Sequence, residues 1–117
     1  MSLQSLIRIE YAVAFLLCLF LYIYLDYSLF LFALFLLLPD VTMIGYFINN
    51  QFGARLYNVG HSFIIPMICI IFALSMGVSS LLMVALIWFA HICMDRALGF
   101  GLKYTEHFRE THIQKIV

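Results

Sequence analysis

The sequence predicts an all-α fold, a four-helix transmembrane bundle with a short juxtamembrane C-terminal segment. Of the 117 residues, 66% are hydrophobic and only 10% are charged, whereas a soluble domain has about a quarter of its residues charged. The apolar residues also form long blocks separated by short polar stretches, which is typical of integral membrane proteins. The length leaves room for a single integral-membrane domain over residues 1–117.

Each apolar block is long enough to cross a bilayer, which takes roughly 20 helical residues. The first helix is predicted at about 6–25, and because it lacks a small-residue cleavage pattern we expect it in the mature protein. The second, at about 28–48, contains Pro39, and the third, at about 56–76, contains Pro66; both prolines predict distortion. The fourth, at about 80–98, ends before two glycines. The polar tail at 103–117 is either solvated or interfacial, with Ile113 toward lipid.

The positive charges predict an orientation. The connections at 26–28 and 77–80 carry no Lys or Arg. In a four-crossing chain the opposite side holds all six of these residues, which are Arg8, Arg55, Arg96, Lys103, Arg109 and Lys115. The positive-inside rule then predicts a multi-pass protein of the cytoplasmic (inner) membrane with both termini cytoplasmic. A re-entrant segment at Pro39 and Asp40 is the alternative.

Charge and cysteine usage narrow the classes of partner. The formal net charge is zero, so no basic field exists to attract nucleic acid. The cysteines have neither disulfide nor zinc-knuckle spacing, and we expect small buried residues at Cys18, Cys69 and Cys93. The expected partners are membrane lipid and a lipid-like substrate. A homodimer also stays open, because four short helices enclose little volume.

Five ionisable side chains inside the apolar blocks are predicted to lie at one depth. With a rise of 1.5 Å per residue, Asp40 lies about 18 Å from the outer end of its helix, His91 about 16 Å and Asp95 about 22 Å. His61 and Glu10 each lie about 24 Å from the outer ends of theirs. In a core of about 30 Å all five fall in the cytoplasmic half of the membrane. Ionised groups are costly in hydrocarbon, so we expect them to face each other inside the bundle.

The residue types and spacings favour a divalent-metal site. His91 and Asp95 lie four residues apart on one helix face, and Asn58 and His61 lie three apart. Zinc binds His and carboxylate ligands, and iron or manganese accepts the same mixture. The predicted ligands are His61, His91, Asp95 and Asp40, the predicted catalytic groups are Asp40 and Glu10, and the further candidates are Asn58, Arg96 and His112.

This ligand set predicts a metal-dependent hydrolase of a lipid or lipid-linked substrate, because the site would lie just below the headgroups. A di-iron or manganese redox bundle is the alternative enzyme. Two non-enzymatic alternatives also stay open. The same groups serve ion or proton carriers, or they form a structural network with Arg8, Arg55 and Arg96. The sequence alone does not decide whether the protein is an enzyme.

Several motifs carry a resemblance to a known family. They are IRIE at 7–10, LLLPDVTMIGY at 36–46, LYNVGHSFIIP at 56–66, HICMDRALGFGLKY at 91–104 and FRETH at 108–112. In this order they resemble a bacterial integral-membrane family described only as domain of unknown function 4260, over almost the whole chain. The resemblance implies a small multi-spanning membrane protein and no assigned activity. Phe100 stands where the resemblance leads us to expect tyrosine.

Overall fold

The computed structural model describes residues 2–103 and 111–115, and nearly all of them are helical. Its elements are α1 (Leu3–Tyr24), α2 (Leu29–Phe35), the 3-10 helix η1 (Leu38–Phe47), α3 (Asn50–His61), α4 (Ile64–Met76), α5 (Ser79–Ala97) and α6 (His112–Lys115). Four stretches are long and apolar enough to cross a membrane, namely Leu3–Tyr24, Leu29–Phe47, Asn50–Met76 and Ser79–Ala97. The predicted all-α, four-crossing fold is therefore confirmed.

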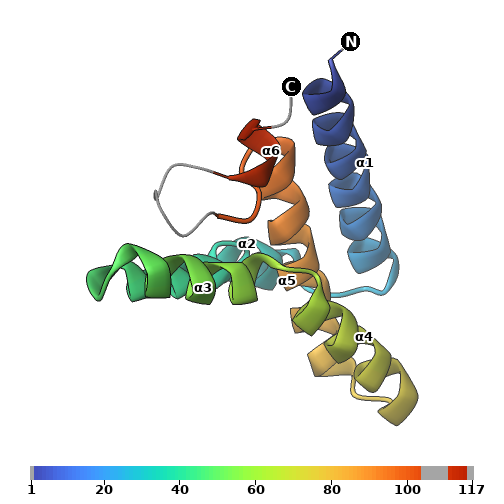
Figure 1. The fold of residues 1–117 in the computed structure, drawn as a ribbon. Helices are drawn as coiled ribbons and strands as arrows, with labels where there is room; N and C mark the ends of the chain where they lie inside the picture. The colour runs from blue at the N-terminus through green and yellow to red at the C-terminus, as the bar shows by residue number, and fades with distance from the viewer. Residues whose placement is uncertain (1, 104–110, 116–117) are drawn as a thin grey trace.

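The long helices α1 and α5 pack side by side in antiparallel register (Figure 1). At one end the Arg8 side chain donates to the Ala97 carbonyl, 2.9 Å from Nε. At the other end the Tyr27 hydroxyl lies 2.9 Å from the Ser79 hydroxyl, which joins the two connections that follow α1 and α4. Between these ends lies an apolar core formed with α2, consisting of Cys18, Tyr22, Phe32, Leu86, Ile87 and Ala90.

The second crossing differs from the continuous helix predicted at 28–48. Ser28 caps α2 by accepting a hydrogen bond from the Leu31 amide, but α2 ends after seven residues and the chain continues as η1. The cause is Pro39, which has no amide hydrogen and disfavours helical backbone in the residue before it. The break brings Asp40 to the first turn of η1.

The third crossing, predicted as one helix at 56–76, is divided as well. It begins six residues earlier, because Asn49 caps α3 by accepting from the Phe52 amide at 2.7 Å. It breaks at Ser62, where the backbone turns extended, and restarts as α4 with Pro66 in its first turn. Proline is tolerated there because the first-turn amides of a helix need no partner within it. His61 thus becomes the last residue of α3.

The helices η1 and α3 form a hairpin, hereafter the η1–α3 hairpin, which runs across the direction of α1 and α5 (Figure 1). The two backbones approach closely because glycines line the contact. A Cβ atom on Gly53 would clash with Tyr46, 2.8 Å from its Cα, and one on Gly60 would clash with Thr42. Larger residues at these positions would separate the two helices.

The C-terminal segment folds back onto the cytoplasmic end expected from the sequence, where α6 lies beside the start of α1 (Figure 1). The Gln4 side chain donates to the Ile113 carbonyl at 3.0 Å, and an isolated bridge joins Lys103 and Thr111. Ile113 is completely buried, so its predicted contact with lipid is wrong. It packs into the protein because the segment turns inward rather than along the membrane surface.

Candidate metal centre

Four of the predicted side chains meet at one point, although three separate elements supply them. Asp40 comes from η1, His61 from the end of α3, and His91 and Asp95 from successive turns of α5. One ligand atom from each residue lies within 4.8 Å of every other. We call these four residues the His/Asp cluster. The i, i+4 spacing on α5 fixes one pair, and the breaks at Pro39 and before Pro66 present the other pair.

Five of the six distances between the four candidate ligand atoms are nearly equal, and all six lie within 4.8 Å. Nε2 of His61 is 3.0 Å from Nε2 of His91, 3.1 Å from Asp40 Oδ1 and 3.3 Å from Asp95 Oδ2. Nε2 of His91 is 3.1 Å and 3.2 Å from the same two oxygens. In a tetrahedral zinc site with bonds of roughly 2.0–2.1 Å, ligand atoms lie about 3.3 Å apart. The five measured edges therefore fit four atoms around one small cation.

The hydrogen bonds of the imidazoles indicate which nitrogens face the centre as acceptors. His61 Nδ1 lies 3.0 Å from the Tyr57 carbonyl, which can only accept, so Nδ1 carries the proton. In neutral His61, Nε2 then carries no hydrogen and has a free lone pair. Two protonated Nε2 atoms cannot face each other at 3.0 Å, so at least one imidazole is an unprotonated ligand at this point. A metal-ligating histidine commonly donates its other ring nitrogen to a carbonyl in this way.

A cation, or protons on the imidazoles, would balance the carboxylates of the cluster. Two carboxylates with two neutral imidazoles carry a charge of −2, which one divalent ion balances. The alternative network would use arginines, but among the described residues neither Arg8, Arg55 nor Arg96 forms an ion pair with these carboxylates. Arg96 instead donates to the Tyr11 hydroxyl at 2.7 Å.

Burial within the cluster is uneven. The side chain of His91 is completely buried, that of His61 is 3% exposed and that of Asp95 is 15% exposed, whereas the Asp40 side chain is 40% exposed. Three ligands are thus enclosed by protein. The Asp40 side is therefore the open side of the cluster.

The end of α3 is held in place by α5. Because α3 stops at His61, its last carbonyls lack partners within the helix. The Trp88 indole donates to the Gly60 carbonyl at 2.6 Å, and the Arg96 guanidinium donates to the His61 carbonyl at 3.4 Å. The helix that supplies two ligands therefore also positions the backbone of a third.

A layer of aromatic rings covers the other side of His61. The Tyr57 ring stacks on the imidazole with centroids 3.8 Å apart, and the Lys103 ammonium lies 4.6 Å from the Tyr57 centroid. Burial lowers the pKa of Lys103, while the nearby Asp95 and Asp40 carboxylates oppose that shift. Sequence reasoning missed these contacts, although Tyr57 stands one helical turn before His61 and Trp88 almost one turn before His91.

The structure does not bring Glu10 into the cluster. Its side chain is exposed on α1, because the face of α1 that meets α5 is the one carrying Arg8, Tyr11 and Cys18. At about 100° per residue, Glu10 points to a different side of the helix. Its predicted depth was compatible with the site, but its direction was not.

Two other predicted residues serve the C-terminal segment. The Asn58 amide accepts from the Lys103 amide at 2.7 Å and donates to the Lys103 carbonyl at 2.9 Å. Nδ1 of His112 accepts from the Leu102 amide at 2.7 Å. Neither side chain is among the four residues of the cluster. Asn58 thus holds the segment that follows α5 against α3, and His112 ties the same segment to α6.

Fold and site together define a helical membrane-type protein with a buried His/Asp cluster. A family model described as domain of unknown function 4260 matches residues 4–116, and the chain belongs to that family. No curated protein and no solved structure matches the chain.

Proposed function

We propose that the His/Asp cluster binds one divalent transition metal, with zinc the best fit. The observation that carries this proposal is the convergence of four candidate ligand atoms, five of whose six separations are 3.0–3.3 Å. Mixed imidazole and carboxylate ligands suit zinc, and also iron or manganese. A dinuclear centre would need further carboxylates, and the described residues supply this one group of four.

We infer that the activity is hydrolysis of an ester, amide or phosphoester. Zinc would lower the pKa of a bound water toward neutrality and so provide a nucleophile at physiological pH. His61, His91 and Asp95, the three enclosed residues, hold the ion. Asp40, the most exposed of the four, would act as the general base that accepts the proton of the attacking water. The water oxygen bonds to the carbonyl carbon or phosphorus, the bond to the leaving oxygen or nitrogen breaks, and Asp40 returns the proton to the leaving group.

The same proposal places the cluster in the cytoplasmic half of the cytoplasmic membrane. The start of α1, the end of α5 and α6 lie together at one end of the protein, and the connections joined by Tyr27 and Ser79 lie at the other. With the positive-inside rule, this supports cytoplasmic termini. In a protein cleared of native cysteines, Ser79→Cys should react with an impermeant thiol reagent from outside and Arg55→Cys from inside. Reaction of both from one side would contradict this orientation.

The metal proposal is tested by metal analysis of detergent-purified protein. We expect about one zinc per chain, and its loss in His91→Ala and Asp95→Ala with insertion unchanged. Glu10→Ala is the matched control, because it removes an exposed carboxylate of α1 that lies outside the cluster, and it should retain the metal. Wild-type protein that never retains any metal would refute the proposal. Variants that only lose stability, by the 3–5 kcal/mol typical of a broken buried pair, would favour the structural network.

Asp40→Asn separates metal binding from the reaction. Because the amide can still approach the ion but cannot accept a proton, we expect the metal to remain and hydrolysis of a generic ester to fall by about 10²–10⁴-fold, the range for a lost general base. Unchanged hydrolysis in metal-loaded Asp40→Asn would exclude this role for Asp40.

A further inference from the structure

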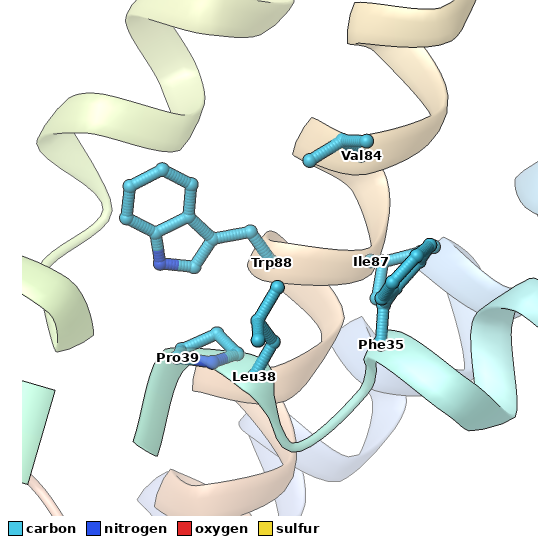
Figure 2. Close-up of a pocket in the computed structure, with 6 residues that line it drawn as sticks. All are labelled: Phe35, Leu38, Pro39, Val84, Ile87 and Trp88. Atoms are coloured by element: carbon cyan, nitrogen blue, oxygen red, sulfur yellow. The ribbon is translucent and has the colours of Figure 1, made fainter. Parts of the chain in front are cut away.

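An apolar pocket of about 300 Å³ lies next to the His/Asp cluster, between the break in the second crossing and α5. Figure 2 shows the Trp88 ring on one side and Phe35 on the other, with Val84 above and Leu38 and Pro39 below; Ile87 completes the lining. The one polar group on these side chains is the Trp88 indole N–H, and the Gly60 carbonyl already accepts from it. Nothing in the lining can recognise a polar ligand.

The position of the pocket connects it to the proposed reaction centre. Pro39 of the lining is bonded directly to Asp40, the exposed residue of the cluster, and Trp88 precedes His91 by three residues on α5. From Val84 to His91 the helix rises about 10 Å. The lining therefore runs from Pro39, the chain neighbour of Asp40, toward the Ser79 end of α5, that is, toward the middle of the membrane in the proposed orientation.

We propose that this pocket holds one aliphatic chain of a membrane lipid that is the substrate, an inference that rests on the proposed hydrolytic function. A lipid in the cytoplasmic leaflet points its chains toward the midplane and its headgroup toward the cytoplasm. A chain between Trp88 and Phe35 would place the first polar bonds of that lipid beside Asp40. A water-soluble substrate would leave this apolar lining unused, so the substrate class is a lipid cleaved next to its chain.

The pocket also has the capacity for this occupant. Ligand pockets begin at about 300 Å³, are predominantly apolar and carry a few polar groups that fix the reacting end. None of the four cluster residues lines the pocket, so in this proposal Asp40, the neighbour of Pro39 in the chain, would act just beyond its end. The apolar stretch of about 10 Å along α5 matches the upper part of one acyl chain.

Trp88 allows the test without any assay of activity, because it is the single tryptophan of the chain. A phosphatidylcholine brominated in the upper part of one acyl chain is titrated into detergent-purified protein, and the tryptophan fluorescence is measured. We expect saturable quenching that unbrominated phosphatidylcholine reverses. Val84→Phe fills the pocket and should raise the half-saturation concentration about tenfold, the discrimination typical of a methylene-scale misfit. Ile71→Phe, at an exposed position of α4 outside the lining, should leave it unchanged.

Quenching that rises without saturation, to the same extent in wild-type, Val84→Phe and Ile71→Phe protein, would overturn the proposal, because it reports only random contact with bulk lipid. Reversal by free fatty acid but not by phosphatidylcholine would overturn it too, since the occupant would then be a free acid. Metal content is measured on the same samples. If the lipid chain binds to protein that holds no metal, the hydrolytic function is refuted and the lipid pocket stands. If the protein holds metal but binds no lipid chain, the lipid pocket is refuted and the metal site stands.

Discussion

The α1–α5 pair and the η1–α3 hairpin each supply two residues of the His/Asp cluster, but their positions are fixed in different ways. The pair consists of two uninterrupted helices of 22 and 19 residues, and α5 supplies His91 and Asp95 by helical spacing alone. The hairpin consists of a 3-10 helix and a short polar α-helix, and it supplies Asp40 and His61. Its geometry depends on glycine contacts and on the capping of α3 by α5. One half of the site is therefore set by local structure and the other by tertiary structure.

Removal of the proposed metal should produce the largest difference in stability between the two regions. A ligand present at 1,000 times its Kd stabilises the state that binds it by about 4.1 kcal/mol. Chelation should then lower hydrogen-exchange protection in the η1–α3 hairpin by up to about a thousandfold, because the proposed ion would tie Asp40 and His61 to α5. Protection around Cys18, Tyr22 and Ala90 in the α1–α5 core should change little. An equal loss in both regions would show that the metal holds the whole fold.

Gly53→Ala should damage the hairpin next most. The new methyl group would meet Tyr46, whose Cα lies 2.8 Å away, and overpacking of this kind costs about 1–3 kcal/mol. Thermal unfolding and metal content should both fall. Gly77→Ala is the control, because Gly77 has a φ of 70° but open space around it. Its strain should lower stability without any loss of metal, and a parallel loss of metal in both variants would contradict the proposed role of the close contact.

Arg96→Met tests the connection between the two regions. Arg96 joins the Tyr11 hydroxyl of α1 to the His61 carbonyl of α3, and hydrogen bonds to charged groups contribute about 1.5–3 kcal/mol. We expect a loss in that range and weaker metal retention, measured by competition with a chelator. Arg8→Met removes the more exposed bond to Ala97 and should change the free energy of unfolding by under about 1 kcal/mol. A larger loss of unfolding free energy in Arg8→Met than in Arg96→Met would contradict the proposed role of Arg96 as the connection between the two regions.

The smallest effect is expected from pH at His112. Burial and the Arg96 charge lower the pKa of His112 below its ordinary value of 6.5, and Nδ1 accepts the Leu102 amide only while it is unprotonated. Docking of the C-terminal segment is therefore fully stable above pH 6.5 and weakens as pH falls below it. Exchange of the Leu102 amide, corrected for intrinsic rates, should increase a few-fold on acidification. In His112→Asn, which accepts without titrating here, that dependence should disappear.

Much of this arrangement follows from simple rules applied to the sequence. The rise of a helix predicted one depth for Asp40, His61, His91 and Asp95, and the structure brings those four together. Depth says nothing about direction, however, which is why Glu10 was misplaced. Its direction depends on which face of α1 meets α5, and the apolar residues of α1 surround the helix on every side.

The helix breaks were harder to predict, because a membrane proline can either kink a helix or end it. The outcome depends on what satisfies the freed carbonyls. Here that role falls to Trp88 and Arg96, thirty residues or so further along the chain. The early start of α3 has a local signal in Asn49, but an apolarity criterion alone overlooks a polar capping residue.

The central position of α5 also constrains how the protein is made. Both α1 and α4 pack on α5, and α5 completes the cluster and caps α3. A ribosome synthesises it after every other long helix. During translation the first three apolar segments must therefore wait in the bilayer without their common partner, and Asp40 and His61 must wait without His91 and Asp95. Nascent chains released before Ser79 should consequently be recognised by membrane quality control, and those released after Ala97 should escape it.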